Sequence, residues 1–225
     1  MDAAADIAAV VFDFDGLVLD TELPIYTAWC AAFEAHGAAP PTIEEWSAEI
    51  GTSGVIDIEA WLVERSDGAV DLDAMHASRR AHCAGLLEVE IVRPGVEAWL
   101  DEADAAGLGL AIASSSDAGW VVGHLERLGL RDRFTHVVTA GDDGLPAKPA
   151  PDTYLTACAL LGVDPEDALA VEDSPNGIKA AKAAGLWCVT VPHMLTETLD
   201  LSAADVRLAS LASSTIADVI AQLSR

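Results

Sequence analysis

Short apolar runs alternate with helical stretches over most of this 225-residue chain, and this alternation constrains the fold more than any other feature. Most of the runs are rich in Val, Ile or Leu without regular polar positions, as expected of strands covered on both faces. The expected strands are Ile7–Phe12, Leu108–Ala113, Thr135–Thr139, Ala168–Val171, Trp187–Val191 and, as a sixth candidate, Val206–Leu208. Strand–helix alternation predicts an α/β fold with a Rossmann-like parallel sheet and right-handed crossovers.

Glycine and proline mark where the helices between these strands begin and end. Helices are expected at Gly95–Ala106, Asp117–Leu128, Asp152–Leu161 and Pro175–Ala184, and each is followed directly by a glycine. The last of them also begins with proline directly after Ser174. Proline in the first turn and glycine just past the last turn are typical helix start and stop signals.

The segment from Thr21 to Val92 interrupts this pattern, because it contains no convincing strand. Amphipathic helices are expected at Leu23–His36, Ile43–Ile50, Ile58–Arg65 and Leu72–Glu88, with Thr42 and Glu45 spaced as in a capping box. We therefore expect an α/β core domain made of residues 1–20 and 93–225. A smaller α-helical cap domain, residues 21–92, would be inserted after strand one.

The charge balance narrows the choice of binding partners. The chain has 37 acidic and 12 basic residues, which gives a net charge of −25. A surface this negative repels nucleic-acid backbones and anionic lipids, so we expect no nucleic acid and no membrane among the partners. An anionic substrate would need a local cation to offset this field.

The first residues, the apolar stretches and the cysteine spacing indicate where in the cell this protein is found and whether it has disulfides or a zinc site. Its first residues carry acids where a signal peptide needs positive charge, and no apolar stretch approaches the ~20 residues of a membrane span. The four cysteines are scattered, without the spacing of a zinc site or a disulfide framework. We expect a cytoplasmic protein, either a monomer or a homodimer.

Acidic residues follow two of the expected strands. Asp13 and Asp15 come directly after the first strand, and side chains two apart share a face of an extended chain. Glu172 and Asp173 follow the fourth expected strand. Each pair alone is equally typical of solvated loop or helix-capping carboxylates. If the two strands are neighbours, four carboxylates converge, and oxygen-only ligation points to Mg²⁺.

Two further segments carry groups suited to binding an anion. Ser114 and Ser115 lie between a strand and a helix, where hydroxyl and backbone N–H groups can bind an anion, although a plain helix cap is equally typical there. Lys148 is one of only three lysines, and it is followed by Pro149, which favours an extended backbone before it. Lysine binds phosphate as a point charge, whereas the alternative is an ordinary loop lysine.

These four segments occur in the order DFDGLVLDTE, IASSS, KPAPD and VEDSPNGIKAAKAAG. In that order they resemble the four successive motifs of the haloacid dehalogenase (HAD) superfamily. The similarity is to its phosphatase and β-phosphoglucomutase-like members, which carry an α-helical cap after the first motif. The resemblance covers the whole chain.

The resemblance implies a phosphoric monoester hydrolase with defined roles for the motif residues. Asp13 would be the nucleophile that forms an aspartyl-phosphate, and Asp15 the acid and base. Ser114 would bind a phosphoryl oxygen, together with Ser115, and Lys148 would neutralise phosphoryl charge. The implied ligands of Mg²⁺ are the Asp13 carboxylate, the Asp15 main-chain carbonyl, Asp173 and Glu172, the last either directly or through water.

Two alternatives remain open beside hydrolysis of a small phosphorylated metabolite of the sugar or polyol phosphate class. Sugar phosphomutases of the same family carry a histidine where this chain has Ile25, which favours hydrolysis. Receiver-type signalling modules also use a phosphorylated Asp, but they keep their acids upstream of the lysine and lack a helical insert. Asp15 itself favours phosphoryl chemistry, since the dehalogenases of the family lack an acid there.

The expected cap would set the choice of substrate by closing over the site. It carries no motif that identifies this substrate. Aromatic and charged side chains of the cap that could face the site are Trp46, Glu49, Trp61, Arg65, Arg79 and Arg80.

Overall fold

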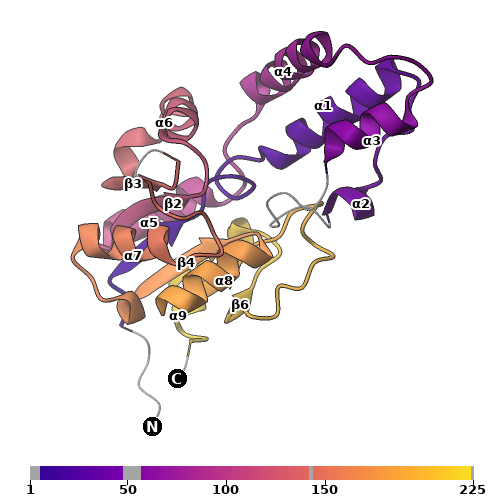
Figure 1. The fold of residues 1–225 in the computed structure, drawn as a ribbon. Coiled ribbons are helices and arrows are strands. Elements are labelled where there is room, and N and C mark those ends of the chain that lie inside the picture. Colours follow the sequence, from indigo (N-terminus) through magenta and orange to yellow (C-terminus); the bar gives the residue numbers. More distant parts are fainter. Residues whose placement is uncertain (1–5, 48–56, 142–143, 224–225) are drawn as a thin grey trace.

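The computed structural model describes residues 6–47, 57–141 and 144–223, and it places a six-stranded parallel sheet at the centre of the molecule (Figure 1). The strands are β1 (Ala9–Phe12), β2 (Gly109–Ser114), β3 (His136–Thr139), β4 (Ala168–Glu172), β5 (Trp187–Thr190) and β6 (Val206–Arg207). Their order is β3-β2-β1-β4-β5-β6, and every neighbouring pair is parallel. The predicted α/β class and the parallel sheet are confirmed.

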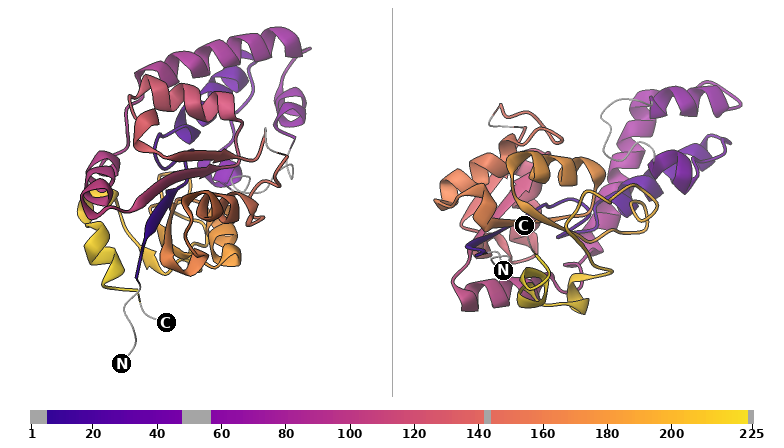
Figure 2. Two further views of the ribbon diagram at one scale, coloured as in Figure 1. Left: turned by 90° about the vertical axis from the view of Figure 1, so that its left-hand side faces the viewer. Right: turned by 90° about the horizontal axis from the view of Figure 1, so that it is seen from below.

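Helices cover both faces of the sheet (Figure 2). One face packs against α5 (Val96–Ala106), α6 (Ala118–Arg127) and α9 (Ile216–Ile220), and the other against α7 (Asp152–Leu161) and α8 (Pro175–Ala184). Side chains of β1 alternate between the two cores, with Val10 and Phe12 on the α5 side and Ala9 and Val11 on the α7 side. All four are fully buried, which explains why the strand reads as one apolar run.

The helix ends confirm the signals in the sequence. Gly107, Gly162 and Gly185 follow α5, α7 and α8 in the left-handed conformation, where a side chain would be strained. Asp117 caps α6 and Ser174 caps α8, each accepting a hydrogen bond from a first-turn N–H. Short 3₁₀ turns lie at Arg131–Arg133, Pro165–Asp167 and Leu211–Ser213.

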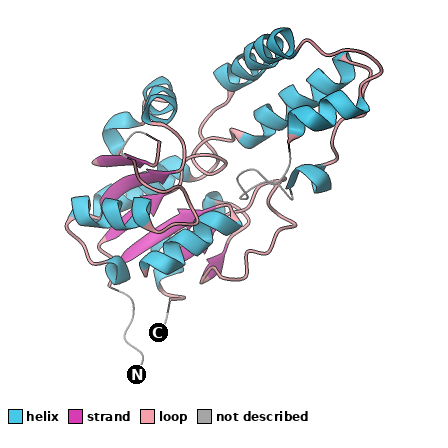
Figure 3. Cartoon of the chain, viewed as in Figure 1, coloured by secondary structure: helices cyan, strands magenta, loops and turns pink. Residues whose placement is uncertain are grey.

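The described part of the segment between β1 and α5 consists of helices joined by loops and contains no strand (Figure 3). It forms α1 (Glu22–Ala35), α2 (Ile43–Ser47), α3 (Ile58–Arg65) and α4 (Leu72–Val89), and it lies to one side of the sheet (Figure 1). Its own apolar cluster contains Trp29, Phe33, Leu62 and Met75. The predicted capping box of α2 is present, since Thr42 and Glu45 exchange backbone-to-side-chain hydrogen bonds of 2.8 and 3.1 Å. The predicted continuation of this helix to Ile50 lies outside the described residues.

The strand order fixes where a ligand can bind. β1 lies between β2 and β4, so the chain crosses to opposite sides of β1 in the two halves of the sheet. In open α/β sheets, ligands bind at the carboxyl ends of the strands flanking such a reversal. Within the described ranges, no helix is both long enough and apolar enough to span a membrane.

Candidate active site

Three buried carboxylates meet at the carboxyl ends of β1 and β4. Asp13 follows β1 and extends its pairing, since its N–H donates to the carbonyl of Val171 at 2.9 Å. Glu172 ends β4, and Asp173 comes next. One oxygen from each of Asp13, Glu172 and Asp173 lies within 4.8 Å of the others. Residues 159 positions apart in the chain thus form one acidic cluster, because β1 and β4 pair in parallel.

Lys148 places its ammonium group against this cluster. Its Nζ contacts Asp13 Oδ1 and lies 2.7 Å from Glu172 Oε1, with only 6% of the side chain exposed. The loop that carries it is tied to the loop after β2, since the Lys148 N–H donates to Ser115 Oγ at 3.1 Å. The lysine is therefore a buried counter-charge to the carboxylates.

The pKa values show that this cluster carries too much negative charge for its burial. Burial raises the pKa of Asp13 well above its ordinary value; Lys148 opposes this shift, and Glu172 and Asp173 add to it. Burial and the nearby Glu172 likewise raise the pKa of Asp173 well above its ordinary value, against the influence of Arg93 and Lys148. Such a site favours a bound cation, because a divalent ion stabilises the ionised carboxylates.

The donor set fits Mg²⁺ in its chemistry. Mg²⁺ prefers carboxylate, carbonyl and phosphate oxygens, and the cluster offers carboxylates alone. Asp13 and Asp173 would hold the ion through their carboxylates. Glu172 is already bonded to Lys148 by one of its oxygens.

The carboxylate of Asp15 faces a different set of groups. Its Oδ1 accepts hydrogen bonds from Thr21 Oγ1 at 2.9 Å and Trp120 Nε1 at 2.8 Å, and its Oδ2 from Ser116 Oγ at 2.7 Å. The sequence suggested four converging carboxylates, and the structure groups three. The chain turns directly after Phe14, where Val18 N–H donates to the Phe14 carbonyl, so the two-residue rule for strands no longer applies at Asp15.

Ser114 and Ser115, at the end of β2 and in the loop after it, make different contacts. Ser114 is fully buried at the end of β2; its Oγ accepts the Ser116 N–H at 3.0 Å and lies 3.4 Å from Asp15 Oδ2. Ser115 is exposed and receives the bond from the Lys148 backbone. The structure thus brings both predicted serines to the same sheet edge as Asp13 and Lys148.

Glu172 is surrounded by donors on both oxygens. Oε1 accepts from Lys148 and from the Tyr154 hydroxyl, each at 2.7 Å. Oε2 accepts from the N–H groups of Asp173 at 3.1 Å and Ser174 at 3.4 Å. Burial, with Glu172 as the next cause, raises the pKa of Tyr154 well above its ordinary value, so the hydroxyl keeps its proton and donates it.

Asp173 is enclosed from the side of β5. His193 Nε2 lies 3.0 Å from Asp173 Oδ2, although its N–H is not aimed along that line. Gly16, with φ +78°, lies so close that a side chain there would overlap Asp173 Oδ2. Arg93 donates to the carbonyls of Gly16 and Pro192, and so joins the loop after β1 to the loop after β5.

Several residues of this site were not singled out by the sequence analysis. They are Thr21, Arg93, Ser116, Trp120, Tyr154 and His193. Tyr154 had a readable signal, since it lies in the first turn of the helix that follows the Lys148 loop. The others depend on contacts between distant segments, which spacing along the chain does not reveal.

The residues expected to face the site from the helical insert mostly serve its internal packing. Arg65 lies over the Trp61 ring and pairs with Glu45 at 2.9 Å. Arg79 lies over Trp29, and Trp46 packs against Tyr26. Of the remaining two, Arg80 is exposed on α4, and Glu49 lies outside the described residues.

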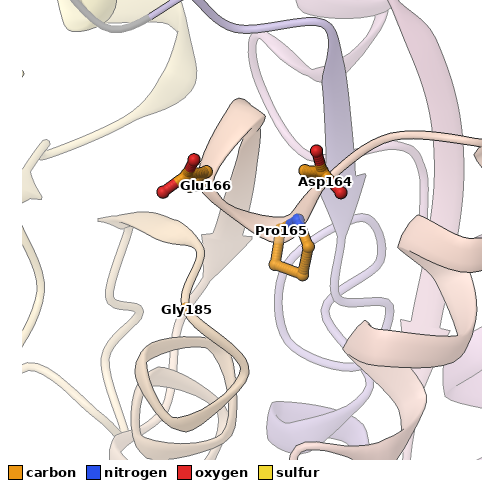
Figure 4. A pocket seen from close by; sticks show the side chains of 4 residues that line it. All are labelled: Asp164, Pro165, Glu166 and Gly185. Atoms are coloured by element: carbon orange, nitrogen blue, oxygen red, sulfur yellow. The ribbon is translucent and has the colours of Figure 1, made fainter.

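A separate hollow of about 560 Å³ lies at the opposite edge of the sheet (Figure 4). It is lined by Asp164, Pro165, Glu166 and Gly185, from the loop before β4 and the end of α8. These residues are at the amino end of β4, whereas the acidic cluster is at its carboxyl end. The hollow is therefore not part of the candidate active site.

Comparison with known proteins places this arrangement in a family. The family model of haloacid dehalogenase-like hydrolases matches residues 7–185. The chain is 44% identical over 211 residues to YhcW of Bacillus subtilis (strain 168), which is named as a phosphatase, covering 94% of this chain and 95% of YhcW. It is 29% identical to hexitol phosphatase B of Escherichia coli (strain K12), covering 98% of this chain and 100% of that protein.

A solved structure agrees with these relatives. The crystal structure of CbbY from Rhodobacter sphaeroides in complex with phosphate superposes with a TM-score of 0.74 at 31% identity, over 94% of this chain and 98% of that one. Both the fold and the family predicted from the four motifs are confirmed. With its acidic cluster and lysine at the carboxyl ends of β1 and β4, this chain belongs to the haloacid dehalogenase-like hydrolases.

Proposed function

We propose that this hydrolase is an Mg²⁺-dependent phosphatase that acts on a small phosphorylated metabolite through an aspartyl-phosphate on Asp13. The observation that carries the proposal is the contact of Lys148 with Asp13 inside a cluster of three buried carboxylates. A phosphate dianion needs positive charge to approach such a cluster, and Lys148 supplies part of it. Relatives named as phosphatases support the same reaction class.

Asp13 carries the covalent step of the proposed reaction. A carboxylate oxygen of Asp13 attacks phosphorus, the bond between phosphorus and the ester oxygen breaks, and that oxygen takes a proton from Asp15. Water then attacks the aspartyl-phosphate and gives a proton to Asp15, which releases inorganic phosphate and restores the Asp13 carboxylate. Splitting the displacement into two steps is the usual advantage of a carboxylate nucleophile.

Asp15 has to leave its present hydrogen bonds to do this work. Its carboxylate is bonded to Thr21, Ser116 and Trp120. Rotation of the side chain toward Asp13 would free it for proton transfer, which typically contributes about 10²- to 10⁴-fold in rate. Thr21 immediately precedes α1, so movement of the helical insert would act directly on Asp15.

The phosphoryl group would be held by Ser114, Ser115 and Lys148. Bound Mg²⁺ would neutralise and orient phosphoryl oxygens. Asp13 and Asp173 are the carboxylates that we propose as its ligands, with the Asp15 main-chain carbonyl as a further member. Glu172 would join the set through water, because both of its oxygens already accept hydrogen bonds from the protein.

We assign substrate selection to residues 21–92, acting as a cap over a core of residues 1–20 and 93–225. We propose a sugar or polyol phosphate as the substrate, and the similarity to hexitol phosphatase B supports that class. A cytoplasmic location and a monomer or homodimer remain predictions.

Mutase activity is the alternative outcome of the test. Ile25 occupies the place of the mutase histidine, and it is partly buried against the cores of both the sheet and the insert. An imidazole is therefore missing where a mutase would need it.

A receiver-type signalling module is the other alternative. The match to the family of haloacid dehalogenase-like hydrolases argues against it.

The test is a product assay with a panel of sugar and polyol phosphates. We expect release of inorganic phosphate with Mg²⁺, loss of release in EDTA and recovery when Mg²⁺ is restored. Asp13→Asn should lower turnover by at least about 10³-fold while leaving circular dichroism unchanged. Isomerised phosphosugar without free phosphate would indicate a mutase, and activity in the Asp13→Asn variant would refute the nucleophile.

A further inference from the structure

A buried tyrosine lies behind the proposed phosphate-binding lysine. Tyr154 is fully buried in the first turn of α7. Its hydroxyl lies 2.7 Å from Glu172 Oε1 and 3.4 Å from Lys148 Nζ, and the lysine Nζ is 4.8 Å from the centre of its ring. One side chain thus contacts both members of the Lys148–Glu172 ion pair.

The hydroxyl and the ammonium share one oxygen of Glu172. Oε1 accepts from both groups, and the backbone N–H groups of Asp173 and Ser174 occupy Oε2. A carboxylate offers about four acceptor positions, so Glu172 is saturated by protein donors. Because the tyrosine donates to Oε1, the lysine does not have to satisfy that oxygen alone.

We propose that Tyr154 is a positioning residue for Lys148, acting through Glu172. By satisfying part of the Glu172 charge, its hydroxyl leaves the Lys148 ammonium directed toward Asp13, where the phosphoryl group binds. The inference rests on the proposed function. It adds a residue that contacts neither the phosphoryl group nor the nucleophile.

Removal of the hydroxyl has a defined consequence. In a Tyr154→Phe variant, Oε1 is left buried with Lys148 as its only donor. An unsatisfied buried charge is costly, so Glu172 draws the ammonium away from Asp13. The Lys148 ammonium then lies farther from the phosphoryl group, so its attraction for phosphate is weaker. Both phosphate binding and turnover should decrease.

The chain offers a matched control, since it has only two tyrosines. The hydroxyl of Tyr26 donates to the Pro41 carbonyl at 2.9 Å within the helical insert. Tyr26→Phe therefore removes the same group from a tyrosine with no hydrogen bond to Lys148 or Glu172. We would measure the Kd of inorganic phosphate by calorimetry in Mg²⁺, and kcat/KM with p-nitrophenyl phosphate.

We expect Tyr154→Phe to weaken phosphate binding and to lower kcat/KM, each by about 10-fold, as for loss of a hydrogen bond to a charged group. The Kd of inorganic phosphate in Tyr26→Phe should stay within about twofold of wild type, because the groups proposed to hold phosphate lie outside residues 21–92. A lower melting temperature with unchanged Kd would show a merely structural role and would overturn the inference. Phosphate binding without turnover in the wild type would refute the proposed function alone, because the Kd comparison still tests Tyr154.

A double-mutant cycle tests the route through Glu172. In a Glu172→Gln background, the carboxylate charge that Tyr154 shares is absent, so adding Tyr154→Phe should change the Kd by less than about twofold. If the 10-fold weakening persists in that background, the hydroxyl does not act through Glu172. Circular dichroism of both Glu172→Gln variants checks that they are folded, so the comparison reports the hydroxyl and not a loss of structure. Wild-type protein that binds no phosphate in Mg²⁺ would overturn this inference and the proposed function together.

Discussion

At the scale of single residues, the acidic cluster depends on how closely the backbone approaches it. Gly177, in the first turn of α8, lies against the carboxyl group of Glu172, and a side chain there would overlap both of its oxygens. Gly123, on α6, has no atom within 4 Å of the corresponding position. A side chain at Gly123 would therefore fit without any contact, whereas one at Gly177 would displace Glu172.

Gly177→Ala should displace Glu172 and with it Lys148. We expect a loss of about 1–3 kcal/mol in the free energy of unfolding and a fall of about 10- to 100-fold in turnover. Gly123→Ala should leave turnover unchanged and stabilise the protein by about 0.5–1 kcal/mol, as alanine does in a helix. Urea unfolding and phosphate release measure both effects, and equal behaviour of the two variants would contradict the packing argument.

Glu22 makes stability depend on pH. Burial, together with Asp173 and Asp15, raises the pKa of Glu22 to about 7. The folded protein thus holds a proton that the unfolded chain releases near pH 4.5, so this residue lowers stability progressively as pH rises from 4.5 to 7. Below that window both states are protonated and the effect vanishes.

Glu22→Gln should remove this penalty. In EDTA at pH 8 we expect the variant to gain about 1–2 kcal/mol in the free energy of unfolding, a value that allows for the partial exposure of Glu22. At pH 4.5 the gain should disappear. Urea unfolding of variant and wild type at pH 8 and pH 4.5 measures this difference in the free energy of unfolding. An equal gain at both pH values would mean that packing, and not charge, is responsible.

At the scale of secondary-structure elements, helix starts position the groups around Asp15. Asp117 caps α6 by accepting the N–H of Trp120 at 2.8 Å, and the Trp120 indole then reaches Asp15. The sequence predicted this helix to start at Asp117. It did not predict α9, although Thr215 and Asp218 form a capping box there, because the five-residue helix is too short for a periodic apolar pattern.

Asp117→Ala should remove the cap of α6. We expect a loss of about 1 kcal/mol in the free energy of unfolding, whereas Asp117→Ser should retain most of it because serine caps equally well. Thermal and urea unfolding measure the difference. A Ser variant as unstable as the Ala variant would show that the capping bond is not the cause.

At the scale of the whole molecule, the helical insert has an apolar cluster of its own. Leu62 is fully buried in that cluster, while its neighbour Val63 is 50% exposed. The sheet is covered by two other clusters, one on each face. The cluster on the α5 side also includes Ala28, Cys83 and Leu87 of α1 and α4, whereas α3 contributes no residue to it. Loss of packing at Leu62 in α3 should therefore affect the insert without reaching the sheet.

Leu62→Ala should destabilise the insert by about 2–4 kcal/mol, the usual cost of emptying a buried leucine site. Val63→Ala is the control and should change stability by less than about 0.5 kcal/mol. Hydrogen exchange should quicken in α1, α3 and α4 and stay unchanged in β1 and β4. Faster exchange in the sheet would show that insert and sheet unfold as one unit.

The sequence by itself determined the parallel α/β class, the ends of the helices α5 to α8 between the strands, and the edge at which Asp13, Lys148 and Asp173 lie. Parallel strands carry their following residues to one edge, so residue order along the chain was enough for that. Only the tertiary structure decided that Asp15 turns toward Ser116 and Trp120, and that Tyr154 shares Glu172 with Lys148. Side-chain direction depends on donors supplied by segments far apart in the chain, and no local pattern encodes those contacts.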